Sequence, residues 1–424
     1  MGEDTRGEIV LTAWDSLRSN SPYTEETQQT PEGTMTFRVY ADHAEWVDYN
    51  GNDTALTVPD TVGGQPVTAV GDNCVSSGYY LSELTLPATV TRIGEKAFLL
   101  ANLTKVNLPE GLTYLGHYAM ANFKGEELIL PGTLEYIGFK CFSGAKFETI
   151  TIPASVKTIC RTPFYSCSNL KSIQVEGGSY ASVDGVLFSA DKKTLIAYPG
   201  GAGDSYTVPE GTEVIGHSAF AGNYNMKQVV LPETLKRIDN FGFGYCESLT
   251  DLQLPESLEF IGQGAFGTDI GMPKSDTTKV ITIGKNVSYS GADAFSCFNL
   301  TEYVVDPDNE HYSSADGCLL NVGGTALLSV PYAIEGTFEV PYGVCYLAGR
   351  SLQDCNGITE LILPDSVAAI DLEAGVPSGL QKLTVGVGLI VWENVAEYSL
   401  VSDITISEDN PMYTVSGGQI TEKP

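Results

Sequence analysis

The chain has 424 residues and is short of charge, and of positive charge above all. Charged residues make up 18% of it, and 53 acidic residues against 23 basic ones leave a net charge of −30. Such a charge repels the phosphate backbone of nucleic acids and anionic lipid surfaces before any specific contact forms. The composition therefore argues against a nucleic-acid partner and against a peripheral membrane role.

Long apolar runs are also missing. No stretch approaches the eighteen consecutive apolar residues of a membrane-spanning helix, and the first residues, MGEDTRGEIV, lack the basic region and apolar run of a secretory signal. We therefore expect no direct membrane insertion of this segment. The chain is nonetheless 42% hydrophobic and 10% aromatic, which is enough to build a large core.

Reactive side chains are scarce as well. There are four histidines, and the sequence contains neither a C-x-x-C pair, nor a G-x-S-x-G elbow, nor an H-E-x-x-H pair. His117 and His217 occupy the same position of a repeat, at least three further repeats apart, so they cannot share a metal ion. The sequence predicts no catalytic residues, no cofactor and no metal site.

What the sequence has instead is a repeat. A hydrophobic-x-hydrophobic-Pro tetrad returns with a period of about 22 residues, and the prolines are Pro87, Pro109, Pro131, Pro153, Pro209, Pro232, Pro255, Pro341 and Pro364. Alternation before each proline is typical of a short half-buried strand, which the proline ends because it cannot donate to a ladder. A second short extended piece, such as TRIG or EYIG, follows in each copy.

A unit of 22 residues cannot bury its own apolar face, so consecutive units must stack around one continuous interior. The sequence therefore predicts a mainly β solenoid with short irregular or helical segments. Eleven residues beyond each proline slot stands a large apolar residue, which we expect to form an interior column. Its members are Phe98, Met120, Phe142, Phe164, Phe220, Phe243, Phe266, Phe295 and Leu352.

Two interruptions of the repeat resemble each other, and each is typical of a β-hairpin inserted between coils. Upstream, two alternating segments, 35–40 and 44–49, predict a hairpin that caps the first coil. The predicted organisation is an unassigned tail or linker at 1–33, a capping hairpin at 34–58, repeats at 59–175, an inserted hairpin at 176–208, repeats at 209–306, a second inserted hairpin at 307–340, degenerate repeats at 341–407 and the start of a third, truncated module at 408–424.

The tetrad followed by x-x-[LV]-x-x-I-G-x-x-A-F-x-x-C-x-x-L, together with the insert SVDGVLFSADKKTLIAYP, resembles the BspA-like leucine-rich repeat proteins, also described as the Treponema pallidum type. The resemblance covers about residues 34–424. It implies a right-handed leucine-rich-repeat solenoid and a secreted or surface protein, commonly of host-associated bacteria, with adhesion or protein binding as its usual role. It implies no catalytic residues, and the signal and anchor that such proteins use are absent from this segment.

The nine cysteines follow the register of the repeat. Cys167, Cys246 and Cys355 lie fourteen residues beyond their prolines and Cys297 thirteen beyond its glycine, in a slot that elsewhere holds Ala101, Ala145, Asn223 or Ser378. A slot that accepts these residues is a small buried niche, so we interpret the cysteines as packing thiols. Cys74, Cys141, Cys160, Cys318 and Cys345 also fall at repeat positions, and the pattern argues against a disulfide framework or a zinc site.

Two acidic clusters open inserted modules: Asp306, Asp308 and Glu310, and later Glu408 and Asp409. Calcium prefers flexible, oxygen-rich loops of this kind. The spacing is not that of an EF-hand, and turn formation explains the same residues. Turns are the favoured interpretation, with calcium as the alternative.

The outward residues of the first strand of each repeat form two columns. Side chains at a fixed spacing of about 4.8 Å make a flat surface suited to an extended peptide or a protein edge. The predicted ligand-binding residues are Glu83, Thr85, Lys105, Asn107, Glu127, Ile129, Thr149, Thr151, Gln174, Gln228, Val230, Asp251 and Gln253.

The sequence leaves three functions open. The first is a non-enzymatic extracellular or cell-surface protein that binds a protein partner, such as a host matrix or surface protein, or a glycan. The second is a structural spacer that displays another domain. The third is a carbohydrate-active enzyme, which would need a pair of acidic residues facing one pocket, and the periodic columns do not offer such a pair.

Overall fold

The computed structural model describes residues 21–75, 78–249, 252–267, 278–291, 294–295, 299–398 and 400–423. The chain divides into two compact units, Met1–Gly203 with Ala219–Gly222 (unit 1) and Asp204–Ser218 with Asn223–Pro424 (unit 2). Within the described ranges the secondary structure is β apart from one short helix, α2 (Val395–Tyr398). The mainly β solenoid predicted from the repeat is confirmed in both units.

Unit 1 begins with an antiparallel meander of β1 (Thr24–Gln29), β2 (Gly33–Val39) and β3 (Ala44–Gly51). The predicted hairpin corresponds to β2 and β3, whereas β1 lies in the stretch to which the sequence assigned no element. Parallel pairing of β3 with β6 (Gln65–Val70) joins the meander to the repeats, and β5 (Thr61–Val62) pairs with β6 in the antiparallel sense. Residues 1–20 lie outside the described part.

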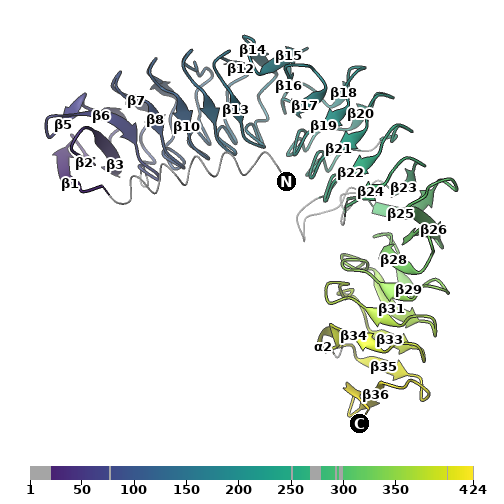
Figure 1. The fold of residues 1–424 in the computed structure, drawn as a ribbon. Coiled ribbons are helices and arrows are strands. Elements are labelled where there is room, and N and C mark those ends of the chain that lie inside the picture. The colour runs from purple at the N-terminus through teal and green to yellow at the C-terminus, as the bar shows by residue number, and fades with distance from the viewer. Residues whose placement is uncertain are drawn as a thin grey trace. The chain divides into compact units, whose positions relative to one another are not determined.

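The coils of unit 1 form two kinds of parallel ladder, whose strands Figure 1 shows in succession from β6 to β14. The first strands of the coils are β4 (Ala55–Thr57), β7 (Glu83–Thr85), β9 (Lys105–Asn107), β12 (Thr149–Ile152) and β14 (Ser172–Val175). The second strands that follow β6 are β8 (Arg92–Ile93), β10 (Tyr114–Leu115), β11 (Tyr136–Ile137) and β13 (Thr158–Ile159). The tetrad before Pro131 is not part of a strand, so the first ladder is interrupted between β9 and β12.

The first inserted module is an antiparallel set of β15 (Tyr180–Val183), β16 (Val186–Ser189) and β17 (Thr194–Ala197). Asp184 and Gly185 connect β15 to β16 with φ values of 50° and 82°, as a type I′ hairpin turn requires. The amide of Ile173 in β14 donates to the carbonyl of Gly185 at 2.7 Å, which attaches the hairpin to the preceding coil. The module therefore interrupts the repeat in sequence while remaining bonded to it.

Unit 2 repeats this organisation. Its first strands are β18 (Ser205–Thr207), β20 (Gln228–Val230), β23 (Thr278–Ile283), β25 (Asn299–Val305), β29 (Gly336–Glu339), β31 (Ile358–Leu363), β33 (Lys382–Val385) and β35 (Asp403–Ile406). Its second strands are β19 (Val214–Ile215), β21 (Arg237–Ile238), β22 (Phe260–Ile261), β24 (Tyr289–Ser290), β30 (Tyr346–Leu347), β32 (Ala369–Ile370) and β34 (Val391–Trp392). The second module is β26 (Tyr312–Ala315), β27 (Cys318–Asn321) and β28 (Ala326–Ser329), and the hairpin of β36 (Tyr413–Ser416) and β37 (Gln419–Glu422) follows β35.

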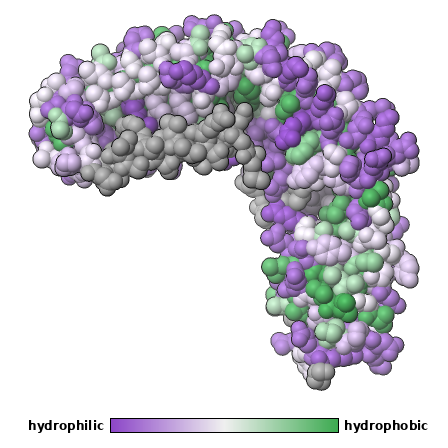
Figure 2. Space-filling view, viewed as in Figure 1, coloured by the Kyte–Doolittle hydropathy of each residue, from purple (hydrophilic) through white to green (hydrophobic). Residues whose placement is uncertain are grey.

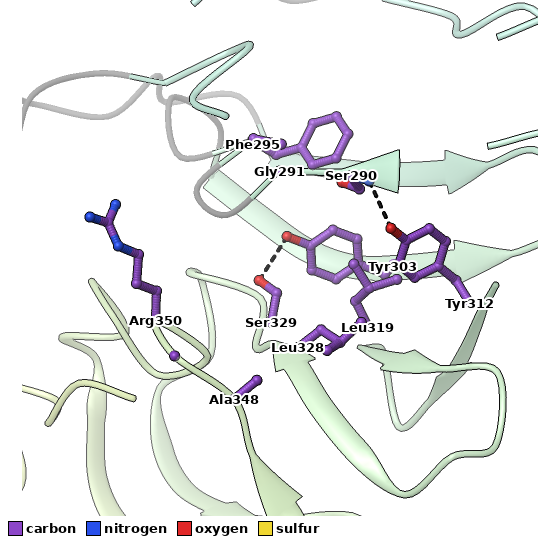
Figure 3. A pocket seen from close by; sticks show the side chains of 12 residues that line it. Ser290, Gly291, Phe295, Tyr303, Tyr312, Leu319, Leu328, Ser329, Ala348 and Arg350 are labelled. Atoms are coloured by element: carbon purple, nitrogen blue, oxygen red, sulfur yellow. Dashed lines mark hydrogen bonds between the residues drawn. The ribbon is translucent and has the colours of Figure 1, made fainter. Parts of the chain in front are cut away.

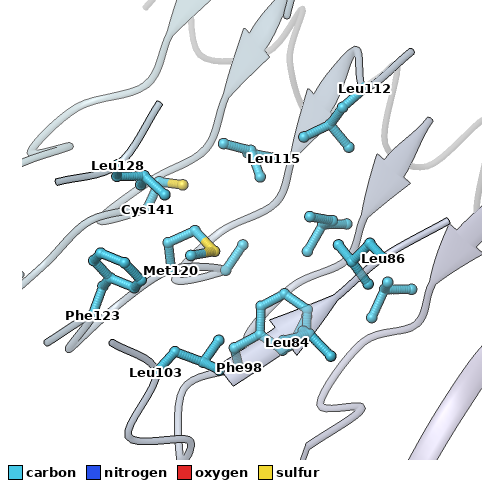
Figure 4. Packing of buried hydrophobic residues seen from close by; sticks show 14 of the residues in the cluster. Leu84, Leu86, Phe98, Leu103, Leu112, Leu115, Met120, Phe123, Leu128 and Cys141 are labelled. Atoms are coloured by element: carbon cyan, nitrogen blue, oxygen red, sulfur yellow. The ribbon is translucent and has the colours of Figure 1, made fainter. Parts of the chain in front are cut away.

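The core of each unit is the predicted apolar column, whose members are all buried. Ring centroids stack at 5.5 Å for Phe142 and Phe164, and at 5.1 Å for Phe243 and Phe266. In unit 1 the aliphatic side chains of the first and second strands close around this column (Figure 4). Burial of each ring stabilises the fold by about 1.5–3 kcal/mol.

A second regularity is a left-handed residue nine positions beyond the proline of a coil. Lys96, Tyr118 and Lys140 have φ values of 53°, 54° and 49° in unit 1, and Phe241 and Arg350 have 55° and 65° in unit 2. In two successive coils of unit 1 the amide of this residue donates to the next coil, from Lys96 to the His117 carbonyl at 2.7 Å and from Tyr118 to the Phe139 carbonyl at 2.9 Å. Backbone pairing between coils thus holds a conformation that few residues other than glycine adopt.

Candidate binding surfaces

The strand face, formed by the two outward columns of the first strands, is exposed as predicted. In unit 1 the register pairs Glu83 with Lys105 and Thr85 with Asn107, while Leu84 points into the core. Every described member of the predicted set is exposed: Glu83, Thr85, Lys105, Asn107, Glu127, Ile129, Thr149, Thr151, Gln174, Gln228, Val230 and Gln253. Asp251 lies outside the described residues.

Two members of the strand face are apolar and widely exposed. Ile129 has 71% of its surface accessible and Val230 has 49%, values more typical of polar side chains. An exposed aliphatic residue in the middle of a polar column adds apolar contact area for a partner. These two positions are therefore the strongest contact candidates within the set.

One predicted contact residue has a structural task. The Asn107 side chain donates from Nδ2 to the Leu86 carbonyl at 3.0 Å and accepts the Leu86 amide on Oδ1 at 2.8 Å. It therefore pairs with the backbone of the preceding coil as a strand would. Both polar atoms of the Asn107 side chain already bond to Leu86, so a partner would meet its exposed surface mainly through van der Waals contact.

Opposite charges on neighbouring coils form exposed ion pairs. Lys157 lies 2.7 Å from Glu135, Lys171 lies 2.7 Å from Glu148, and in unit 2 Lys382 lies 2.8 Å from Glu360. Hydrogen bonding to Lys382 lowers the pKa of the Glu360 carboxyl, and the same pair raises the pKa of Lys382. Exposed pairs of this kind contribute little stability each, but they reduce repulsion between the coils.

The second strands carry an aromatic column on their outer side. In unit 1 the Arg92 guanidinium lies 4.0 Å from the Tyr114 ring, which stacks on Tyr136 at 4.6 Å, and the Tyr136 hydroxyl lies 3.0 Å from the Cys160 sulfur. Burial raises the pKa of Tyr114 to about 12. Since these rings cover one another's faces, the column ties coils together. Sequence reasoning missed it, although its members recur five residues beyond successive prolines.

Unit 2 builds the same column from different residues. The Arg237 guanidinium lies 3.7 Å from the Phe260 ring, and Phe260 stacks on Tyr289 at 4.6 Å. The second strands of both units therefore carry the same arrangement, an arginine over the first of two stacked aromatic rings.

A further group of aromatic and basic side chains lies at the turns that follow the second strands of unit 1. We call Lys96, Tyr118, Phe139, Lys140, Arg161 and Tyr165 the turn strip. Tyr118 meets Phe139 edge to face at 5.4 Å, and the cations of Lys140 and Arg161 each lie 5.4 Å from the Phe139 ring centre. Sequence reasoning did not single out these residues, which stand at three different repeat positions, eight, nine and twelve residues beyond their prolines.

Unit 2 contains a cavity of about 240 Å³ between the second inserted module and the coils beside it (Figure 3). The Tyr303 hydroxyl lies 2.9 Å from Ser329 Oγ across it, and the Tyr312 hydroxyl accepts the Ser290 amide at 2.8 Å. Pockets for small-molecule ligands usually begin near 300 Å³. The cavity is below that range, and the hydroxyl groups of Tyr303, Ser329 and Tyr312 already have partners.

Exposed apolar side chains gather over the degenerate coils of unit 2, where Figure 2 shows a patch of hydrophobic residues. They include Tyr346, Leu372, Ile390 and Val391, with 38%, 59%, 49% and 46% of their surface accessible. In the same coils Trp392 packs edge to face against Tyr398 at 5.3 Å, and both side chains are buried.

Most of the cysteines in the described part of the chain are buried. Cys167, Cys246 and Cys355 are packed in the core, which confirms their interpretation as packing thiols, and Cys297 lies outside the described residues. Their slot is also buried at Ala101, Ala145 and Asn223, but it is exposed at Ser378.

Cys345 departs from the pattern, because its side chain is exposed. It lies four residues beyond Pro341, in an outward position that Thr91 and Thr113 fill in unit 1. Cys345 therefore falls at a repeat position, as expected, but it is not a packing thiol.

The first acidic cluster closes a turn. Asp306 accepts the Asp308 amide at 2.9 Å, and the adjacent Asn309 is buried. Among the described residues, no group of three or more His, Cys, Asp and Glu side chains is arranged to hold a metal ion. The turn interpretation is confirmed for Asp306.

His117 also serves the backbone. Its Nδ1 accepts the Phe139 amide at 2.8 Å, so this nitrogen carries no proton. The half-buried ring is thus part of the turn between two coils. In unit 2, His217 meets Phe241 edge to face at 6.1 Å.

Comparison with known families identifies the repeat. The model described as BspA type leucine rich repeat region matches residues 68–194 and 203–315 in six copies, together more than half of the chain. The chain belongs to the BspA-type leucine-rich repeat family. Within the part that the structure describes, no helix has the length and apolar character to cross a membrane.

Comparison with solved structures finds chains similar to this BspA-type chain. The pneumococcal vaccine antigen PcpA is 21% identical, with 90% of this chain and 99% of that chain covered and a TM-score of 0.52. A leucine-rich repeat protein from Bacteroides ovatus is 16% identical over 90% of this chain and all of its own, with a TM-score of 0.48. A leucine rich cell surface protein from Faecalibacterium prausnitzii is 20% identical, covers 86% and 95%, and has a TM-score of 0.36. The comparison with curated proteins gives no match.

Proposed function

We propose that this BspA-type protein is a non-enzymatic binding protein of the cell surface or the extracellular space, and that it contacts a protein partner through the strand face. The observation that carries the proposal is the pair of exposed columns in each unit, with an apolar point among polar neighbours at Ile129 in unit 1 and at Val230 in unit 2. Membership of the family supports the surface location.

The chemistry of the face suits recognition. Neighbouring side chains of one column lie about 4.8 Å apart, so a partner with an extended segment or a sheet edge meets a contact at every coil. Charges of both signs alternate on it, as at Glu83 and Lys105, which favours a mixed-charge partner over a polyanion.

The reactive groups support a role without catalysis. Burial raises the pKa of both Cys141 and Cys167 to about 12, so these thiols stay protonated and are poor nucleophiles at neutral pH. The acidic residues of the strand face lie along columns instead of facing each other across a pocket.

The test is a binding screen against immobilised host matrix proteins and mucins. For any partner found, Glu83→Lys combined with Glu127→Lys should raise the Kd at least tenfold, because both charges change sign on the face itself. The double variant Glu26→Lys with Glu373→Lys is the matched control, since both residues are exposed outside the first strands of the coils and the net charge changes equally. The absence of any partner at micromolar Kd or tighter would count against the proposal and favour a spacer.

A further inference from the structure

The last three coils of unit 2 differ from the earlier ones on the outer side of their second strands. Four residues beyond the proline, or beyond the glycine that replaces it, the earlier coils carry the polar residues Glu213, Lys236, Glu259 and Ser288. The same position in the last three coils holds Cys345, Ala368 and Ile390. The inward residues of these second strands stay buried. A polar column has therefore become apolar although its side chains remain outside the core.

Stacking of these coils joins the exposed side chains into one surface, which Figure 2 shows. We call it the apolar patch, and its members are Tyr346, Ala368, Ala369, Leu372, Ile390 and Val391. The strands β30, β32 and β34 pair in parallel, with Tyr346 beside Ala369 and Ala369 beside Val391. The amides of Ile390 and Val391 both donate to the Ala368 carbonyl, at 2.9 and 3.1 Å, so the two columns of the patch lie next to each other.

Carboxylates border the apolar patch. The Tyr346 hydroxyl donates to Asp371, and Glu393 Oε2 accepts the Leu372 amide at 3.0 Å. Neither of these two donors carries a charge, so the hydrogen bonds leave the negative charge of both carboxylates in place. The bond from Tyr346 also lowers the pKa of the Asp371 carboxyl, which is therefore ionised at neutral pH.

The charge around the patch limits what can cover it. Between residues 341 and 400 the sequence has seven acidic residues and two basic ones, Arg350 and Lys382, and Lys382 is paired with Glu360. A second copy of this chain would bring the same acidic border against itself, and an anionic membrane would also be repelled. Five of the six patch residues are aliphatic and offer no ring face on which a sugar packs. The patch therefore fits a partner that is apolar in the middle and basic at its borders.

The backbone of the patch favours a helical partner. The strands β30 and β32 are hydrogen-bonded on both sides, in the order β28-β30-β32-β34, so an extended segment would find no free strand edge over them. A helix satisfies its own backbone groups and needs only side-chain contacts. Three strands at a spacing of about 4.8 Å place the outer two about 10 Å apart, which is close to the diameter of a helix with its side chains.

We propose that the apolar patch binds a basic amphipathic helix of a partner protein. The apolar stripe of the helix lies over Leu372, Ile390 and Val391. Its lysine or arginine side chains reach Asp371 and Glu393, and these opposite charges speed association and fix the orientation of the helix. The patch lies on second strands of unit 2, so this proposal is independent of the strand face, which the first strands form.

The experiment measures the Kd of the full chain for three labelled synthetic peptides by fluorescence anisotropy. They are an amphipathic helix of Leu and Lys, the same helix with Glu in place of Lys, and an oligolysine of equal charge. We expect the Leu and Lys helix to bind at least tenfold tighter than either of the others, because it alone offers both an apolar stripe and positive charge. Raising NaCl from 10 to 150 mM should weaken its binding several-fold, because salt screens the acidic border.

A pair of double variants tests the apolar contacts. Leu372→Thr with Val391→Thr should raise the Kd for the Leu and Lys helix at least tenfold, because it removes exposed aliphatic surface. The matched control is Val322→Thr with Met412→Thr, which changes exposed apolar side chains outside the patch and should bind as the parent does. Thermal unfolding midpoints show that each variant is folded.

A pair of single variants tests the border. Glu393→Gln keeps an oxygen that accepts the Leu372 amide but removes the charge, so it should raise the Kd at least twofold at 10 mM NaCl. Glu310→Gln is the control, since it removes one charge from an exposed residue in the second inserted module and should leave the Kd unchanged.

Any one of three binding results would overturn the assignment: equal affinity for the Lys and Glu helices, equal affinity for oligolysine, or unchanged affinity in the Leu372 and Val391 variant. Sedimentation of the chain alone tests the other occupant. Self-association that the same variant abolishes would mean that a second copy covers the patch, and would overturn the assignment too. Glu83→Lys with Glu127→Lys should leave the Kd for the helix within twofold, so that failure of this inference and failure of the strand-face proposal are seen separately.

Discussion

At the residue scale, two buried asparagines explain why the start of an inserted module is fixed. Asn309 donates from Nδ2 to the carbonyls of Gly284 and Val287 at 2.8 and 3.0 Å, and its Oδ1 accepts the amides of His311 and Tyr312 at 2.8 Å each. Asn410 makes the same four bonds at the last hairpin, with donor distances of 3.0 and 3.1 Å. One side chain thus satisfies four backbone groups of two successive coils.

Replacing Asn309 by alanine should destabilise unit 2 by about 2–4 kcal/mol, because buried amides and carbonyls lose their partners. Asn309→Asp should cost nearly as much, since a carboxylate cannot donate to Gly284 and Val287. The denaturant midpoint of unfolding measures both. Asn286→Ala, at an exposed residue with a single bond to the Glu256 carbonyl, is the control and should shift the midpoint little. Equal shifts for Asn309→Ala and Asn286→Ala would contradict the role of the network.

The sequence indicated a turn at Asp306 but not the role of Asn309. The motif around Asn309 and that around Asn410 were both recognised as module starts, yet the carbonyls that they bond lie 21 to 25 residues earlier in the chain. A local pattern cannot name partners one coil away. The same limit applies to Asn107. The alternation of its strand predicted an outward side chain, but it could not predict that the side-chain amide bonds to the Leu86 backbone of the preceding coil.

The thiols offer a second test at this scale. In the native protein at pH 8, iodoacetamide should modify Cys345 well before Cys141 or Cys167. Burial raises the pKa of the latter two to about 12, so they remain uncharged thiols until far more alkaline pH. Peptide mapping by mass spectrometry after timed quenching gives the order in which the cysteines are modified. In guanidinium chloride the three cysteines should react at similar rates. Native labelling of Cys167 at the rate of Cys345 would show that its coil opens.

At the element scale, the interior column was predictable because its spacing from the proline is constant. Phe98, Phe142 and Phe164 are found where the repeat placed them, and so is Met120, which fills the same slot with another residue type. The turn strip was not predictable, because its residues stand at three different repeat positions and only stacking of the coils brings their side chains together.

The column makes a matched pair of substitutions possible. Phe142→Ala should destabilise unit 1 by about 3–5 kcal/mol, because it removes a ring that stacks on Phe164 and leaves a cavity. Phe142→Met should cost under about 1.5 kcal/mol, since Met120 already occupies this slot in the neighbouring coil. Chemical denaturation monitored by circular dichroism compares the two variants. Similar losses for both would mean that stacking geometry, not buried volume, sets the stability of the column.

At the scale of the whole molecule, the charge imbalance should govern the response to salt. With a net charge of −30 and only scattered ion pairs, repulsion among carboxylates opposes the folded state. Raising NaCl from 10 to 150 mM shortens the Debye length from about 30 to 8 Å. We expect the thermal midpoint to rise by a few degrees, about the effect of 1 kcal/mol in a unit of this size. Scanning calorimetry measures the thermal midpoint, and KCl should raise it as NaCl does. A midpoint that falls as salt is added would contradict the expectation.

Division into capping hairpin, repeats and inserted modules is the level at which the sequence is most informative, because each boundary is marked by a break in the 22-residue register. The two compact units do not correspond to these divisions one by one. The border between the units lies near Gly203, at the end of the first inserted module. The domain boundaries drawn from the sequence stay predictions.

The left-handed slot beyond the second strands has a consequence for how such a protein can be improved. Glycine at Lys96, Tyr118 and Lys140 would relieve a conformation that costs other residues about 1–2 kcal/mol, less the freedom that glycine loses on folding. A sequence optimised only for heat resistance would therefore replace these side chains first, and would discard the edge-to-face contact of Tyr118 with Phe139 and the contact of Lys140 with Tyr165.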